Sequence, residues 1–138
     1  MAGMSGATLA YVSLPVSHLE ASVTFYTRFL DFQLSERFGR TALLVASDSR
    51  QHYQLALTEG TPQPGVVLGF AVATAQDWDE LRRYMQLEGQ PLQLEDRGWA
   101  WAMLLLDPDG YRVELVWDRR DQPDGQPYWR GNTAKLGI

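Results

Sequence analysis

The residue whose chemistry stands out first is Glu114, a carboxylate in the middle of a strongly apolar stretch. It follows an Asp-Pro-Asp-Gly sequence at 107–110, and Val113 and Leu115 flank it. The alternation after this sequence predicts the second strand of a β-hairpin. A carboxylate inside such a strand is rarely left dry and unpaired. Glu114 therefore faces solvent, pairs with a cation such as Arg112, or lines a cavity as a metal ligand or polar anchor.

Other residues able to do chemistry are few. The chain has only two histidines, His18 and His52, and no cysteine. A metal site of two imidazoles and one carboxylate would need both histidines, although a single histidine is more often structural. The absence of cysteine excludes thiolate ligands, catalytic thiols and disulfides, and it fits a reducing compartment. No nucleophile elbow or glycine-rich phosphate loop is present.

Length and composition bound the remaining function classes. The 138 residues predict one domain, and 45% apolar and 21% charged residues are typical of a globular protein. The net charge of −5 argues against nucleic-acid binding and weakly favours cationic small molecules. No apolar run reaches the roughly 20 residues of a membrane span, and the first residues lack the pattern of a secretory signal. We expect a cytoplasmic protein that does not bind membranes.

The order of predicted elements repeats itself. Segments 9–16, 33–37, 41–46 and 53–58 have strand-like patterns. A helix after the first of them is predicted to start with a capping box, Ser17 to Glu20. Its apolar face is Leu19, Val23, Tyr26 and Leu30. Strands are predicted again at 66–73, 92–95, 99–106 and 111–117, with a second helix after Thr74 that ends at Gly89.

Two β-α-β-β-β modules are the architecture that this order predicts. Module 1 covers about 9–59, a Pro- and Gly-rich linker covers 60–65, module 2 covers about 66–117, and a tail covers 118–138. We expect an α+β fold in which the modules form a curved, mostly antiparallel sheet around a shared cavity, with the helices outside. The tail is predicted to cover the domain or a partner subunit.

Several segments, in this order, resemble the vicinal oxygen chelate superfamily. They are residues 11–16, 19–26 and 29–32 in the first half, and 67–72, 89–91, 107–110 and 113–115 in the second. That superfamily includes glyoxalase I, extradiol dioxygenases, fosfomycin-resistance enzymes and bleomycin-resistance proteins. The resemblance spans about residues 9 to 117. It implies the same two-module fold, and it makes a homodimer the expected assembly.

The resemblance also implies where a metal would bind. Metal-dependent members take ligands from the first strand of each half, from the last strand of the second half, and in some cases from the last strand of the first half. The matching positions here are Tyr11, Val67 and Glu114, with Leu55 or Ala56 as the fourth. Only Glu114 keeps a strong ligand. We therefore expect no metal and no other cofactor, with Glu114 as a ligand only if a metal is present.

A binding site for a small molecule is expected around Glu114. Strand parity and the resemblance together select Tyr11, Ser13, Val67, Gly69, Ala102, Leu104 and Glu114 as candidate ligand-binding residues, and Trp99, which has the other parity, is added because it lies near the loop at Gly98. The small side chains would leave volume, and Tyr11 and Glu114 would anchor polar groups. Trp99 either packs under a helix, as Trp101 is expected to do, or stacks on a planar ligand. No catalytic residue is assigned.

Two functions follow from these expectations. The first is metal-free binding of a small aromatic or drug-like molecule, as in resistance proteins. The second is an enzyme, either dioxygenase- or lyase-like with a metal at Glu114, or metal-free with Tyr11 and Glu114 as an acid-base pair.

Overall fold

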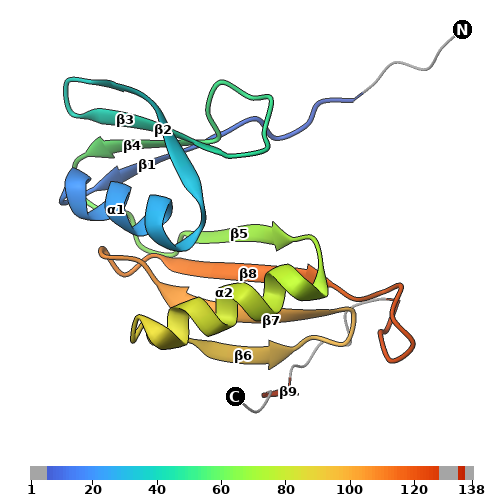
Figure 1. Cartoon of the computed structure of the whole chain (residues 1–138). Coiled ribbons are helices and arrows are strands. Elements are labelled where there is room, and N and C mark those ends of the chain that lie inside the picture. Colours follow the sequence, from blue (N-terminus) through green and yellow to red (C-terminus); the bar gives the residue numbers. More distant parts are fainter. Residues whose placement is uncertain (1–5, 128–133, 136–138) are drawn as a thin grey trace, which may run out of the picture. The chain divides into compact units, whose positions relative to one another are not determined.

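The chain forms two compact units, and the boundary between them lies between Gln63 and Pro64, inside the predicted linker. The computed structural model describes residues 6–127 and the backbone of 134–135 (Figure 1).

The first unit is a four-stranded sheet with one helix. Its elements are β1 (Val12–Val16), α1 (Leu19–Phe29), β2 (Phe32–Phe38), β3 (Thr41–Ala46) and β4 (Leu55–Glu59). The strand order is β1-β4-β3-β2, with β1 parallel to β4 and the other pairs antiparallel. A parallel pair needs a long crossover, and the intervening α1, β2 and β3 supply it.

Helix α1 starts one residue later than the capping box predicts. His18 is the N-cap residue and makes no side-chain capping hydrogen bond, so the prediction of Ser17 as the cap is wrong. The Ser17 hydroxyl lies 3.1 Å from Nδ1 of His18 instead. The buried side of the helix is formed by Leu19, Ser22, Phe25 and Tyr26. Phe25 and Tyr26 pack edge to face with ring centroids 5.0 Å apart, so the aromatic residues determine which side faces the sheet.

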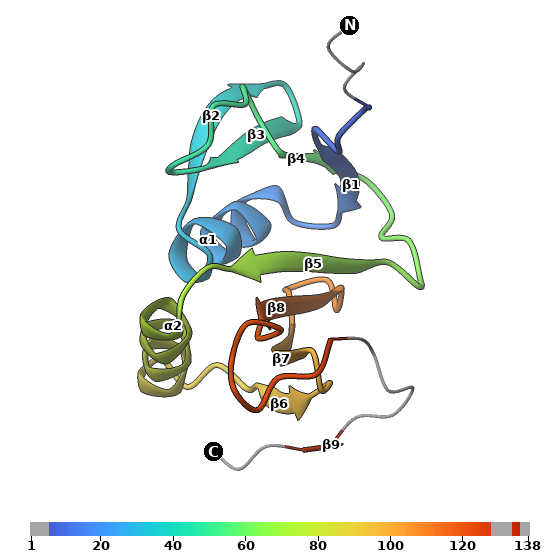
Figure 2. The same ribbon diagram turned by 90° about the vertical axis from the view of Figure 1, so that its right-hand side faces the viewer.

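The second unit repeats the same order and adds a short strand. Its elements are β5 (Val67–Val72), α2 (Ala75–Leu87), β6 (Gln93–Asp96), β7 (Ala100–Leu106), β8 (Arg112–Asp118) and β9 (Ala134–Lys135). The strand order is β5-β8-β7-β6-β9, with β5 parallel to β8. Figure 2 shows α2 along one face of this sheet.

Helix α2 is capped as predicted. The Thr74 hydroxyl accepts a hydrogen bond of 3.0 Å from the backbone N–H of Asp77, which satisfies one of the donors left open at a helix start. Trp78 and Met85 are the buried residues of the helix. The Trp78 ring lies 6.0 Å from both Trp101 and Trp117, on strands β7 and β8. This indole cluster holds the helix against the sheet.

The predicted α+β fold of two β-α-β-β-β modules is confirmed. The strands form two mixed sheets, one in each module, and the strand orders close no barrel. The shared cavity stays a prediction. Within the described part of the chain, neither helix has the length and apolarity that crossing a bilayer requires.

The hairpin turn before Glu114 is held by one buried carboxylate. Oδ1 of Asp107 accepts hydrogen bonds of 2.9 Å from the backbone N–H groups of Asp109 and Tyr111. The N–H of Gly110 donates to the Asp107 carbonyl over 2.9 Å, and Gly110 has the expected positive φ of 83°. The turn thereby sets the register of β8 against β7, and with it the position of Glu114.

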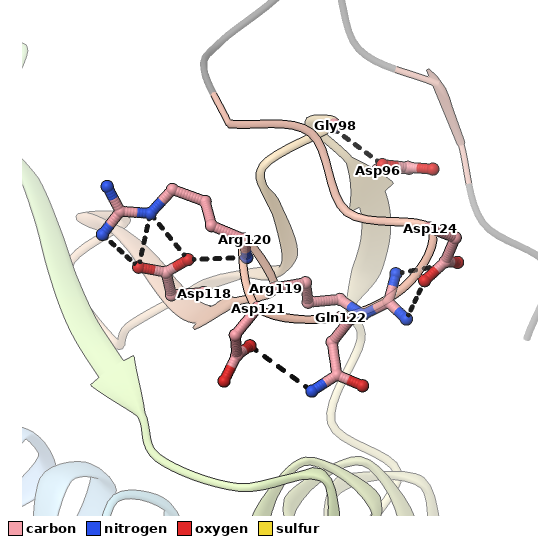
Figure 3. Close-up of polar contacts among 8 residues, drawn as sticks. All are labelled: Asp96, Gly98, Asp118, Arg119, Arg120, Asp121, Gln122 and Asp124. Carbon is pink, nitrogen blue, oxygen red and sulfur yellow. Dashed lines mark hydrogen bonds and ion pairs between the residues drawn. The ribbon is translucent and has the colours of Figure 1, made fainter.

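The segment after β8 folds back onto the second sheet (Figure 3). The backbone N–H of Arg119 donates to the Trp99 carbonyl over 2.7 Å, and the Arg119 guanidinium lies 3.8 Å above the Trp101 ring. Asp124 accepts two hydrogen bonds from this guanidinium, at 2.8 and 3.2 Å. These bonds hold the pKa of Asp124 below its usual value of 3.8. The first part of the predicted tail thus covers the indole cluster, whereas its aromatic residues Tyr128 and Trp129 lie outside the described residues.

We predict that Asp107→Ala lowers the free energy of unfolding by about 1–3 kcal/mol, because the buried N–H of Tyr111 and the partly buried N–H of Asp109 lose their acceptor. Asp107→Asn keeps an oxygen at the same place and should cost clearly less. Urea denaturation followed by circular dichroism measures both. Equal losses in the two variants would contradict the role given to the Asp107 oxygen.

Acid should remove the contribution of Asp124. Its pKa is lowered in the folded protein, so the pair with Arg119 stabilises the fold above pH 3.8 and loses this effect as the pH falls through the folded-state pKa. Asp124→Asn should lower the melting temperature at neutral pH, and the difference from wild type should shrink at lower pH. Asp121→Asn is the control and should show neither effect, because the Asp121 carboxylate accepts a long hydrogen bond of 3.4 Å from its neighbour Gln122 and has no arginine partner among the described residues.

Candidate functional site

The face of the second sheet that lies opposite α2 carries Glu114 at its centre. Strand register arranges this face in three rows, which we call together the Glu114 face. The rows are Val67, Arg112 and Leu106; then Gly69, Glu114, Leu104 and Gln93; then Ala71, Val116, Ala102 and Glu95. Alternate residues of the same strands point the other way, toward the indole cluster.

Glu114 is bound by two arginines. Its Oε1 lies 2.9 Å from Nη2 of Arg97, and its Oε2 lies 2.8 Å from Nε of Arg112. The Glu114 side chain is 13% exposed. Of the alternatives open from the sequence, pairing with a cation is therefore the observed one, and Arg97 joins the expected Arg112.

Arg97 is the buried member of this group. Its side chain is 6% exposed, and its Nε lies 3.2 Å from Oε2 of Glu95. The tight connection between β6 and β7 positions it: the Arg97 N–H donates to the Ala100 carbonyl over 2.8 Å, and Oδ1 of Asp96 accepts from the Gly98 N–H (Figure 3). Gly98 has a φ of 84°, a conformation that favours glycine. One guanidinium thus bridges two carboxylates from neighbouring parts of the sheet.

The charges of this network cancel. Arg97 and Arg112 supply two positive charges, and Glu95 and Glu114 supply two negative ones. Both oxygens of Glu114 are engaged in charge-assisted contacts with guanidinium groups. Acid-base chemistry by Glu114 would first require these ion pairs to break.

The positions implied for a metal do not form a cage. Val67 has no donor atom, Leu55 and Ala56 are buried apolar residues of β4, and both oxygens of Glu114 have arginine partners. Among the described residues, no three His, Asp or Glu side chains are grouped so that they could hold an ion. The residues present therefore do not fit a bound divalent metal.

In the first unit, Ser13 is exposed and alternates along β1 with the buried Leu14 and Val16, and Tyr11 directly precedes this strand. The Tyr11 ring lies 4.8 Å from Tyr53, and His52 lies 3.0 Å from Glu36. Loss of solvent, and then the neighbouring Tyr11, raise the pKa of Tyr53 above its usual value of 10.0. The Tyr53 phenol therefore stays protonated at neutral pH and can donate a hydrogen bond but cannot act as a base.

The two neighbouring tryptophans have different places. Trp101 packs in the indole cluster, 6.0 Å from Trp78 and 5.5 Å from Trp117, as expected for a residue under a helix. Trp99 precedes β7 and is half-buried, and its carbonyl accepts from Arg119. Stacking of Trp99 on a ligand stays a prediction.

One protein-family model matches most of this chain. The model of the Glyoxalase/Bleomycin resistance protein/Dioxygenase superfamily matches residues 8–115. The chain belongs to this superfamily. Sequence relatives include metapyrocatechase of Geobacillus stearothermophilus, at 29% identity over 81% of this chain and 35% of the relative. Glutathione transferase FosA of Serratia marcescens is 28% identical over 78% of this chain and 79% of the relative.

Other relatives agree with this assignment. The manganese-dependent 2,3-dihydroxybiphenyl 1,2-dioxygenase of Geobacillus genomosp. 3 is 24% identical over 87% of this chain and 40% of the relative. The chain thus spans less than half of the length of each of these two relatives, metapyrocatechase and the manganese-dependent dioxygenase. Among solved structures, lactoylglutathione lyase from Agrobacterium tumefaciens has a TM-score of 0.67 at 15% identity, over 83% of this chain and 96% of that one. FosX from Listeria monocytogenes has a TM-score of 0.63 at 15% identity, over 83% and 94%. At these identities the structures show a shared fold.

The structure brings together several of the predicted site residues. Val67, Gly69, Ala102, Leu104 and Glu114 share the Glu114 face, and Ala102 is fully buried while Val67 is exposed. Tyr11 and Ser13 lie in the first unit. Their roles in ligand binding stay predictions. Sequence reasoning missed Arg97, although a turn at Gly98 and the Glu95 parity could have pointed to it.

We predict that Arg97→Met costs about 3–5 kcal/mol of unfolding free energy, because Glu95 and Glu114 lose their buried cation. Arg112→Met is the matched control. That side chain is 46% exposed, so its loss should cost at most about 1 kcal/mol. Chemical denaturation at neutral pH measures both variants. Similar costs would contradict the assignment of Arg97 as the buried member.

Proposed function

We propose that this member of the superfamily binds a small aromatic or drug-like molecule on the Glu114 face without a metal ion. The single observation that carries the proposal is the pairing of both Glu114 oxygens with arginine, at 2.9 and 2.8 Å. Metal-dependent chemistry at this strand would need a carboxylate whose oxygens are not already paired with positive groups. Here the carboxylate organises polar donors instead.

The surface around this network suits an organic ligand. Gly69 and Ala71 lack bulk above β5, and a Cβ added at Gly69 would meet nothing within 4 Å. Val67 and Leu104 add apolar surface in the neighbouring rows. Small-molecule sites combine such apolar walls with a few fixed polar groups. The ion-paired network supplies those polar groups in a fixed arrangement.

The alternative function is that of an enzyme, because the named relatives are enzymes. Metapyrocatechase, FosA and a manganese-dependent dioxygenase are all identified by an activity. On this alternative, the chain would be a dioxygenase- or lyase-like enzyme in which Glu114 exchanges an arginine for a divalent ion. This exchange would have to break the ion pair with Arg97 or the one with Arg112.

The two functions make opposite predictions for metal content. Protein purified without chelators should contain no stoichiometric divalent metal by elemental analysis. Calorimetric titration with catechol and with bleomycin should detect saturable binding of at least one of them, with the same affinity before and after treatment with EDTA. A stoichiometric metal that is present in wild type and lost in Glu114→Gln would contradict the metal-free proposal and favour the enzyme alternative.

A further inference from the structure

We propose that Arg97 determines which ligands the Glu114 face accepts: it takes the place of a cation at Glu114 and leaves Arg112 to bind an oxyanion. The face would thus reject divalent metals and organic cations, and it would select a ligand with an apolar body and one carboxylate or similar group. This inference rests on the proposed function, since it assigns the class of ligand to the same face.

Positive groups already lie beside both oxygens of Glu114. Each carboxylate oxygen has a guanidinium nitrogen within 2.9 Å, one from each arginine. A cation that reached either oxygen would lie directly beside a positive group and would be repelled by it. The charge of Glu114 is therefore already compensated within the protein.

Arg97 is held more firmly than Arg112. Arg97 is 6% exposed and has a second carboxylate partner in Glu95, at 3.2 Å, so its removal from Glu114 would disturb two buried ion pairs. Arg112 is 46% exposed and pairs with Glu114 through Nε. An arginine that uses Nε for one carboxylate can still present its two terminal nitrogens to another oxyanion. Arg112 is thus the polar group that a ligand can reach.

Arg112 lies between two exposed apolar side chains. Its register neighbours are Val67, which is 52% exposed, and Leu106, which is 60% exposed. A cation between two exposed apolar side chains suits a ligand whose oxyanion is attached to an apolar body. The net charge of −5 is spread over the whole chain. It is screened over about 8 Å at physiological ionic strength, so the groups in direct contact decide the selectivity.

Manganese titration tests the role of Arg97. Without its guanidinium, Glu95 and Glu114 are two carboxylates that share the site of a lost cation, and they should then bind Mn²⁺. We expect Arg97→Met, measured by calorimetry with MnCl₂, to bind at least tenfold more tightly than wild type. The double variant Arg97→Met with Glu95→Gln should lose this gain. If Arg97→Met fails to fold, Arg97→Gln is used in its place. The glutamine amide can still donate a hydrogen bond to one of the two carboxylates but carries no positive charge.

Wild-type protein that binds Mn²⁺ as tightly as these variants would overturn the role of Arg97. Folded variants that show no gain would overturn it equally. Circular dichroism establishes that each variant is folded before the titration.

A matched pair of aromatic probes tests the ligand class on wild-type protein. Benzoate and benzamidine have the same ring and opposite charges. We expect benzoate to bind at least tenfold more tightly than benzamidine, and Arg112→Met to remove the difference. Tighter binding of benzamidine would overturn the inference. Failure of benzoate, benzamidine, catechol and bleomycin all to bind would contradict the proposed function, whereas the manganese titration would still decide the role of Arg97.

Discussion

The Glu114 face depends on one guanidinium placed between two carboxylates. Burying an ion costs on the order of several kcal/mol unless geometry and hydrogen bonding are good, so Arg97 requires its partners to be held accurately. The turn at Gly98 fixes the arginine, and the hairpin at Asp107 fixes the register that carries Glu114. The local backbone and the ion-paired network therefore support each other, and neither would be stable in this form without the other.

The two modules share a topology but differ in what their exposed faces carry. In the first, the tilted rings of Tyr11 and Tyr53 lie in contact, next to the pair of His52 and Glu36. In the second, the polar groups of the Glu114 face are mostly charged and largely shielded from water. A repeated fold thus provides two different chemical surfaces, which is how a common scaffold in one superfamily can host unrelated functions.

Most of the fold could be predicted because it depends on local patterns. Strand alternation, the Thr74 cap and the Gly110 turn are each encoded within a few residues. The start of α1 was missed because Ser17 instead lies beside the His18 imidazole. The site was only partly predictable. The alternation of side chains along a strand predicts that Glu114 and Gly69 share a face. Arg97 reaches Glu114 from a turn, where side chains do not alternate in this way.

All five tryptophans of the chain lie in its second half, from Trp78 onward. Three of them have ring centroids within 6.0 Å of one another, and the Arg119 guanidinium covers two of these. The coupled electronic transitions of these three neighbouring rings therefore report on the second module. The protein carries a built-in optical label that can separate the melting of its second half from that of its first.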